Sequence, residues 1–224
     1  MAILYIVATP IGNLKDISFR ALETLRGVDL ILCEDTRVTK KLLDYYKINV
    51  PTLSCHQHSE LKKVEYIIQL LKRGKNLALV SDAGTPGISD PGNKLINIIA
   101  ARPGLPINIV PIPGPCAITA AASVSGFPTD RFLFLGFPPV KNKRKKFFKE
   151  AASSKYTVIF YESPHRIIKT LKEIGFFARE REIAVCRELT KKFETIYRGS
   201  VEKVIQDIEK DEIRGEFVVI LGEK

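Results

Sequence analysis

The sequence contains no Trp, a single Met and only four Cys in 224 residues. The cysteines are scattered and form no C-x-x-C pair, so neither a zinc knuckle nor a disulfide framework is indicated. No apolar run approaches the roughly 20 residues that span a membrane. The apolar start, residues 3–8, is short and lacks the basic lead of a secretory signal peptide. We therefore expect a cytoplasmic protein that does not enter a membrane.

Two common nucleotide-binding patterns are also missing. Neither the dinucleotide fingerprint G-x-G-x-x-G nor the phosphate loop G-x-x-x-x-G-K-[ST] occurs, and the glycine-rich loops carry no lysine to meet a phosphate. These absences argue against NAD and ATP. They favour a cofactor with little negative charge that is held by main-chain amides and carbonyls.

Acidic residues are the minority among the charged side chains. The chain has 35 Lys and Arg against 25 Asp and Glu, a formal net charge of +10. Such an excess favours an anionic partner such as nucleic acid. A lysine-rich proteome would produce the same excess without any such partner.

The most informative stretch is 80–92, V-S-D-A-G-T-P-G-I-S-D-P-G. An apolar run at 77–80 leads into it, and a helical pattern of apolar residues follows at 95–99. Glycine allows a backbone to approach a ligand closely, and proline fixes the shape of a loop. Because an ordinary turn needs only two to five residues, we interpret this loop as a binding loop; an ordinary surface connection is the alternative.

Strands and helices alternate through the first half. Strands are predicted at 3–8, 28–33, 52–53, 77–80 and 107–112, with a helix between each pair. This order predicts an α/β fold with a mostly parallel, doubly wound sheet. The loops 9–13, 34–37, 81–92 and 113–116 leave the carboxyl ends of its strands, which is where open parallel sheets bind ligands.

The pattern changes after a helix of small residues at about 116–126. Strands are predicted at 131–136, 157–161, 183–187, 195–198 and 216–221, with helices at 142–152, 164–174 and 201–209. Several strands with few helices between them indicate a mixed or antiparallel sheet. We therefore predict two domains, 1–115 and 116–224.

Six motifs in order resemble one family: T-P-I-G-N-L (9–14), C-E-D-T-R (33–37), S-D-A-G-T-P-G-I-S-D-P-G (81–92), P-G-P (113–115), Y-E-S-P-H-R (161–166) and R-E-L-T-K (187–191). It is the bacterial small-subunit ribosomal RNA (cytidine-2′-O)-methyltransferase family, a branch of the tetrapyrrole methylase superfamily. The resemblance implies S-adenosylmethionine as cofactor and a cytidine ribose in the decoding region of 16S ribosomal RNA as target. It also implies a cofactor cleft between the two domains, and a homodimer.

The resemblance further implies which residues contact the cofactor. Thr85 stands where tetrapyrrole enzymes have an aspartate, in the loop that corresponds to their glycine-aspartate-proline motif. The implied cofactor contacts are Pro10, Gly84, Thr85, Pro86, Ile88, Cys116, Ala117, Tyr161 and Leu189.

Methylation of a 2′-hydroxyl suggests a general base, because the hydroxyl is a poor nucleophile until its proton is drawn off. Asp35, His58 and Glu60 are the predicted catalytic residues, and His56 is a further candidate. For Asp35 the alternative is capping of the next helix, and the two histidines could be merely structural. The family usually has Asn where Ser59 stands. Nothing completes a metal site around these residues, so no metal is predicted.

Glu162 and Glu188 are alternative bases, although each could simply pair with an arginine, Arg166 or Arg187.

RNA binding requires phosphate contacts from basic side chains. Arg37 and Lys40, beside the predicted crevice, are expected to orient the target nucleotide, and Asn13 to bond ribose or base or else stabilise its own turn. Phe147 and Phe148 are expected to belong to the core rather than to stack on bases. The predicted RNA-binding segment comprises Lys143, Arg144, Lys145 and Lys146; a solvated charged face is its alternative.

Two other functions fit the same sequence. The first is methylation of a tetrapyrrole, against which Thr85 and the basic segment argue. The second is a non-catalytic RNA-binding assembly factor with this fold.

Overall fold

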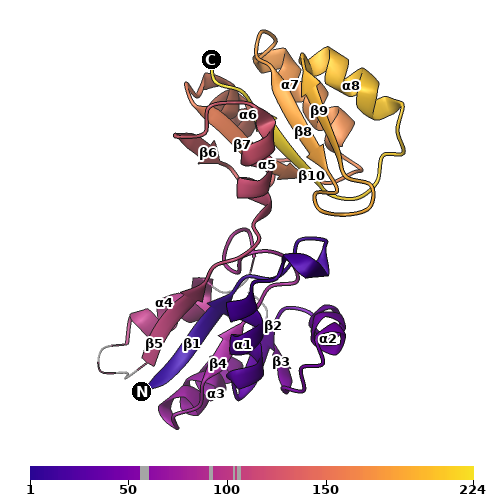
Figure 1. Ribbon diagram of the computed structural model, residues 1–224. Helices are drawn as coiled ribbons and strands as arrows, with labels where there is room; N and C mark the ends of the chain where they lie inside the picture. The colour runs from indigo at the N-terminus through magenta and orange to yellow at the C-terminus, as the bar shows by residue number, and fades with distance from the viewer. Residues whose placement is uncertain (56–60, 91–92, 103, 105–106) are drawn as a thin grey trace. The chain divides into compact units, whose positions relative to one another are not determined.

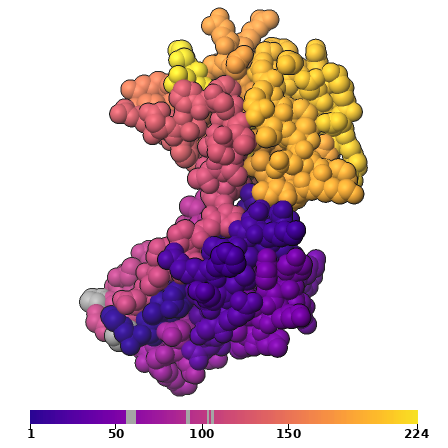
Figure 2. Space-filling model, in the orientation of Figure 1, coloured from indigo at the N-terminus to yellow at the C-terminus, as the bar shows by residue number. Residues whose placement is uncertain are grey.

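The computed structural model describes residues 1–55, 61–90, 93–102, 104 and 107–224. The chain forms two compact units, Met1–Cys116 and Ala117–Lys224, and the boundary between them in the sequence lies one residue from the predicted one. Figures 1 and 2 show the N-terminal unit in indigo to rose and the C-terminal unit in rose to yellow.

The N-terminal unit is built on a five-stranded, all-parallel sheet of order β3-β2-β4-β1-β5. Its strands are β1 (Ala2–Val7), β2 (Leu30–Cys33), β3 (Thr52–Ser54), β4 (Leu77–Leu79) and β5 (Ile107–Ile112). Its helices are the 3-10 turn η1 (Leu14–Asp16), α1 (Phe19–Gly27), α2 (Thr36–Tyr45), α3 (Leu61–Lys72) and α4 (Asn93–Ala100). The predicted parallel sheet is confirmed.

Both faces of this sheet are covered. Successive side chains of a strand point to opposite faces, and β2 shows this directly: Ile31 and Cys33 pack in the core that includes α1 and α2, whereas Leu32 packs in the core that includes α3 and α4. The near-continuous apolar strands follow from this double burial. The sheet is therefore doubly wound, as predicted.

The C-terminal unit has a five-stranded mixed sheet of order β6-β7-β10-β8-β9, in which only β6 and β7 are parallel. Its strands are β6 (Phe132–Phe134), β7 (Thr157–Glu162), β8 (Ile183–Arg187), β9 (Thr195–Gly199) and β10 (Phe217–Leu221). Its helices are α5 (Ala117–Ser125), α6 (Arg144–Ser153), α7 (Ile167–Phe177) and α8 (Val201–Glu209). The predicted mixed sheet is confirmed.

The core of this unit lies where α6, α7 and α8 pack on one side of the sheet (Figure 1). Phe148 is fully buried there and Phe147 packs against the same cluster, which confirms that both belong to the core. The small-residue helix α5 contacts β7, β8 and β10. Helix α6 begins two residues later than predicted, because Lys143 takes a left-handed conformation with φ 63°. Among the residues that the structure describes, no helix is both long and apolar enough to cross a membrane.

Candidate functional site

The loops that follow β1 and β4 are joined by main-chain hydrogen bonds. Thr9 N donates to Gly84 O at 2.9 Å, and Gly84 N donates to Thr9 O at 3.0 Å. The buried Thr9 hydroxyl also donates to the Ser81 carbonyl at 3.2 Å. Two loops that are more than 70 residues apart in the chain are thus fixed against each other at the carboxyl edge of the sheet.

Glycines are required where these loops approach their neighbours. Gly84 has φ +81°, and a Cβ there would lie 3.3 Å from Ile11 Cγ2. A Cβ on Gly114 would lie 3.0 Å from that of Ala8. The Thr85 hydroxyl donates to the Pro115 carbonyl at 3.2 Å and so ties loop 81–92 to the P-G-P turn. Three of the four predicted loops therefore form one backbone-walled edge.

The predicted cofactor residues divide between the two units. Pro10, Gly84 and Pro86 are buried in the N-terminal unit, Ile88 is exposed, and Thr85 and Cys116 are half-buried. Their place in these loops agrees with the expected cofactor loop, but no contact with a cofactor is tested.

The other three, Ala117, Tyr161 and Leu189, belong to the C-terminal unit. Tyr161 packs edge-on against Phe134, with ring centroids 5.0 Å apart. Leu189 is buried between two residues with positive φ, Glu188 at 51° and Thr190 at 67°. Backbone strain of this kind concentrates at functional sites, so the role of Leu189 stays a prediction with this support.

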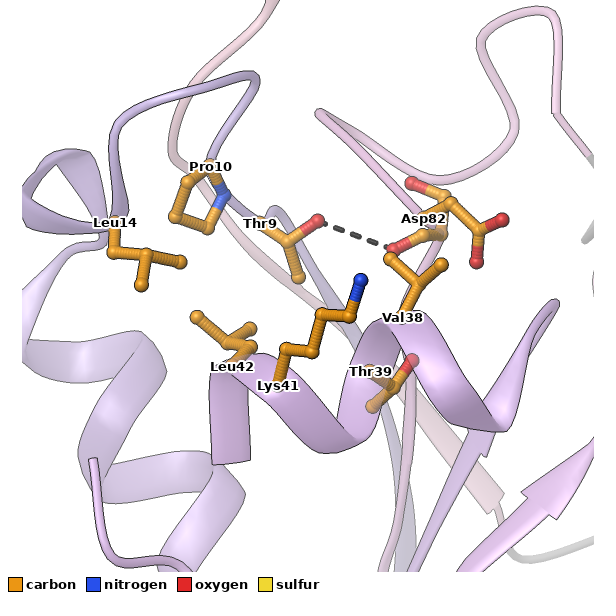
Figure 3. A pocket seen from close by; sticks show the side chains of 9 residues that line it. Thr9, Pro10, Leu14, Val38, Thr39, Lys41, Leu42 and Asp82 are labelled. Atoms are coloured by element: carbon orange, nitrogen blue, oxygen red, sulfur yellow. Dashed lines mark hydrogen bonds between the residues drawn. The ribbon is translucent and has the colours of Figure 1, made fainter. Parts of the chain in front are cut away.

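A small cavity opens beside the first of these loops (Figure 3). Its volume is about 160 Å³, and it lies among the loop after β1, the first turns of α2 and the start of loop 81–92. The side chains that define it include Pro10, Leu14, Thr39, Lys41, Leu42 and Asp82. The N-terminal unit thus has a concave site at the edge where parallel sheets bind ligands.

Asp35 is the N-cap of α2, the alternative role considered for it. Its Oδ1 accepts from Arg37 N at 2.8 Å, and its Oδ2 accepts from Arg37 Nη2 at 2.6 Å. The Arg37 guanidinium, more than any other group, lowers the pKa of Asp35 to about 2. A carboxylate with so low a pKa is a weak proton acceptor, and both oxygens are engaged. The structure therefore argues against Asp35 as the general base.

The predicted substrate contacts around Asp35 differ in accessibility. Arg37 is 87% exposed despite its pairing, and Lys40 is exposed too, so both can reach an anionic ligand. Asn13 accepts from Lys15 N at 3.1 Å and caps η1, the turn-stabilising role. The two other predicted catalytic residues, His58 and Glu60, and the candidate His56 lie outside the described residues, so their roles stay predictions.

Glu162 is not an accessible base. Its carboxylate is fully buried, and it accepts from Arg166 Nη2 at 2.7 Å and from the Thr170 hydroxyl at 2.5 Å. The pairing with Arg166 was the expected structural role. Glu188 binds Lys191 Nζ at 2.8 Å rather than an arginine side chain.

The prediction that Arg144 contacts RNA is wrong. Its guanidinium is 8% exposed and donates to Glu173 Oε2, to the Thr170 hydroxyl and to the Pro139 carbonyl. Arg144 points into the unit, where it pairs with Glu173 and lies 3.9 Å from the fully buried carboxylate of Glu162. The neighbouring Lys143, Lys145 and Lys146 are exposed, and their contact with RNA stays a prediction.

Sequence reasoning did not single out Asp90 at the end of the binding loop. Burial raises the pKa of Asp90 to about 6, with a smaller contribution from the carboxylates of Glu34 and Asp82; a hydrogen bond with Ser81 acts in the opposite direction. The repeated Ser-Asp dipeptide in loop 81–92, at 81–82 and 89–90, was the signal in the sequence that could have drawn attention to Asp90. Within the described ranges, no group of three or more His, Cys, Asp or Glu could hold a metal ion.

Comparison with known proteins places the chain in a family. Residues 3–205 match the model of the tetrapyrrole (corrin/porphyrin) methylases. The ribosomal RNA small subunit methyltransferase I of Thermotoga maritima is 46% identical over 224 residues and the whole of both chains. The Bacillus subtilis protein of the same name is 47% identical over 99% of this chain and 75% of its own.

Solved structures agree on the fold. Cobalt precorrin-4 methyltransferase superposes with a TM-score of 0.71 at 22% identity, over 98% of this chain and 94% of its own. Diphthine synthase gives 0.72 at 14% identity, over 99% and 90%. At these identities the structural similarity shows the fold alone, whereas the matches to the family model and to the two methyltransferases show the family. The chain belongs to the tetrapyrrole methylase family, among its ribosomal RNA small subunit methyltransferase I proteins.

Proposed function

We propose that this protein transfers a methyl group from S-adenosylmethionine to the ribose 2′-oxygen of a cytidine in the decoding region of 16S ribosomal RNA. The observation that carries the proposal is near-full-length identity of about 46% to proteins named as small-subunit ribosomal RNA methyltransferases. The motif resemblance described above supplies the finer points, namely the cytidine and its 2′-oxygen. Such a substrate would place the enzyme in the cytoplasm, and family resemblance adds a homodimer.

The residues at the carboxyl edge of the N-terminal sheet suit this cofactor. A Cβ on Gly84 or Gly114 would crowd Ile11 or Ala8, so these glycines let the loops pack closely and present their backbone at this edge. The glycine loops carry no lysine for a phosphate. The Glu34 carboxylate acts on Asp90 there, and two neighbouring carboxylates favour a positively charged group. When bound, S-adenosylmethionine supplies a methyl group on a sulfonium that the 2′-oxygen attacks.

The chain contributes mainly by positioning, since most of the barrier to such a displacement is lowered by orientation. The Thr9–Gly84 bridge holds two loops in fixed register, and the Thr85 bond to Pro115 adds a third. Asp35 holds the Arg37 guanidinium at the start of α2, where it can meet a phosphate of the RNA. His58 and Glu60 remain the proposed groups for removing the 2′-proton.

RNA contact falls to exposed cations in this proposal. Arg37 and Lys40 would bind near the target nucleotide, while Lys143, Lys145 and Lys146 would add phosphate contacts from the C-terminal unit. Arg144 is withdrawn from this set because it is buried.

The decisive experiment incubates purified protein with methyl-labelled S-adenosylmethionine and either small ribosomal subunits or a precorrin, and then maps the modified nucleotide. We expect label on one cytidine 2′-oxygen of 16S RNA. Label in the precorrin alone would refute the proposal in favour of tetrapyrrole methylation. Cofactor that neither raises the melting temperature nor yields label would favour the non-catalytic assembly factor.

A further inference from the structure

The cavity of the N-terminal unit has the size of a single ring. At about 160 Å³ it resembles the ~150 Å³ engineered cavity that takes up one benzene molecule. Sites for whole cofactors are larger, on the order of 300 Å³ or more. The cavity therefore has room for one six-membered ring.

Its walls are apolar on two sides. Pro10 and Leu14 lie on one side, from the loop after β1 and from η1, and Leu42 faces them from α2 (Figure 3). Apolar side chains of this kind hold a base that has been turned out of its stack. The walls thus suit the faces of a flat ring.

Polar groups stand at the rim. The Lys41 side chain extends from α2 toward Thr9 and Asp82 in Figure 3, which places an ammonium donor and a carboxylate acceptor at one opening. Asp82 Oδ1 accepts from Asp35 N at 3.0 Å, so the cap residue of α2 fixes that carboxylate. A ligand that carries a hydrogen-bond donor for the Asp82 carboxylate and an acceptor for the Lys41 ammonium would match this rim.

Thr39 also lines the cavity, although its hydroxyl oxygen is itself buried. Among the residues that the structure describes, the Thr39 hydroxyl is the one buried side-chain oxygen or nitrogen without a regular hydrogen-bond partner. The Cys33 thiol, whose pKa is raised by burial, lies within reach of this hydroxyl, but sulfur is a weak hydrogen-bond partner.

Cytosine matches these features. Its exocyclic amine donates, and carboxylates accept from that amine; its ring nitrogen and carbonyl accept from ammonium groups. Uracil would place a carbonyl oxygen where cytosine has the amine, opposite the Asp82 carboxylate, and two acceptors repel. We propose that this cavity binds the base of the target nucleotide, with Asp82 and Lys41 selecting cytosine over uracil. The inference rests on the proposed function and adds where its specificity resides.

The test measures discrimination rather than activity alone. Small subunits are assembled with the target cytidine or with uridine in its place, and kcat/KM for methylation is measured on each. For Asp82→Asn, whose amide can face a carbonyl, we expect the cytidine-to-uridine ratio to fall about tenfold or more. Lys41→Met should lower kcat/KM on cytidine by a similar factor. S-adenosylmethionine affinity should stay within twofold of wild type in both.

Matched controls come from exposed residues of the same unit. Asp44→Asn, on α2 like Lys41, and Lys72→Met, on α3, should leave the cytidine-to-uridine ratio of kcat/KM unchanged. Val38→Phe, which narrows the cavity, should abolish methylation while the cofactor still binds; this variant keeps the proposal testable if Asp82→Asn fails to fold.

The outcomes separate the two proposals. A wild-type protein that methylates no cytidine sinks the proposed function itself. Normal cytidine methylation with an unchanged ratio in Asp82→Asn overturns the base pocket and leaves the function standing. A large loss of cofactor affinity in Asp82→Asn or Val38→Phe overturns the base pocket as well, because the cavity would then belong to the cofactor.

Discussion

Each unit has a carboxylate at or just after the end of a strand with an arginine close by, yet the two arrangements differ. In the N-terminal unit, Asp35 and Arg37 form an ion pair in which the side chains are 28% and 87% exposed. In the C-terminal unit, Glu162 is fully buried between Arg166 and Arg144. The residue types are the same, but the surroundings are not.

The difference separates binding from architecture. An exposed pair gains little stability in water and leaves its cation accessible to another anion. A buried pair interacts strongly in a medium of low dielectric, but both charges are needed to offset their lost hydration. Arg37 can therefore serve a ligand, whereas Arg144 and Arg166 serve the fold.

The largest effect is expected from removing the buried carboxylate. Glu162→Ala leaves Arg144 and Arg166 without their shared partner and should lower the free energy of unfolding by about 3–5 kcal/mol. Urea unfolding followed by circular dichroism measures it. Asp35→Asn is the control, and its midpoint should stay near wild type since Asn also caps helices. An equal loss of unfolding free energy in the two variants would contradict the proposed difference between the buried and the exposed pair.

Adjacent cations on α6 sharpen the same contrast. Arg144→Met should destabilise the protein by about 3 kcal/mol, because it removes one of the two arginines beside the buried Glu162 and the partner of Glu173. Lys145→Glu should leave stability unchanged, weaken binding to small subunits and reduce the salt slope of binding by about 1. Denaturation and salt-dependent binding separate the two effects. An unaltered salt slope for Lys145→Glu would make it a merely solvated residue.

Asp35→Asn also tests the role of the exposed pair in turnover. Since Asp35 holds Arg37 and has a pKa of about 2, we expect methylation to fall less than about tenfold. Removal of a true general base costs on the order of 10²–10⁴. Single-turnover rates at saturating cofactor distinguish these cases, and a thousandfold loss would restore Asp35 as the base.

The smallest effect concerns Asp90. Burial raises its pKa in the folded protein to about 6, above the ordinary value of 3.8. The folded state then binds the proton more tightly, so this contribution to stability is complete below about pH 4 and is lost as pH rises through 6. Asp90→Asn should raise the melting temperature at pH 7.5 by about 2–4 °C, for roughly 1 kcal/mol after solvent screening. At pH 4 it should change little; an equal gain at both pH values would contradict this account.

Local sequence patterns predicted most of the helices and strands of this protein. The strands 107–112 and 183–187 and the helix 201–209 have the predicted bounds, and most other elements shift by one to three residues. Apolar periodicity indicates helices and strands, and strand order with helix spacing indicates the type of sheet, because both signals lie within a few residues. The loops at the carboxyl edge followed from the same topology.

Individual side chains were decided by the tertiary structure. Arg144 and Lys145 are neighbours of similar type, but successive residues of a helix point about 100° apart, and only Arg144 meets Glu173 and Thr170. Lys41 and Asp82 are 41 positions apart and come together only when β4 is inserted between β2 and β1. The sequence by itself determined elements, sheet types and family. Burial and charge neutralisation depend on contacts between distant residues, and so only the folded chain decided which polar groups are available to a ligand.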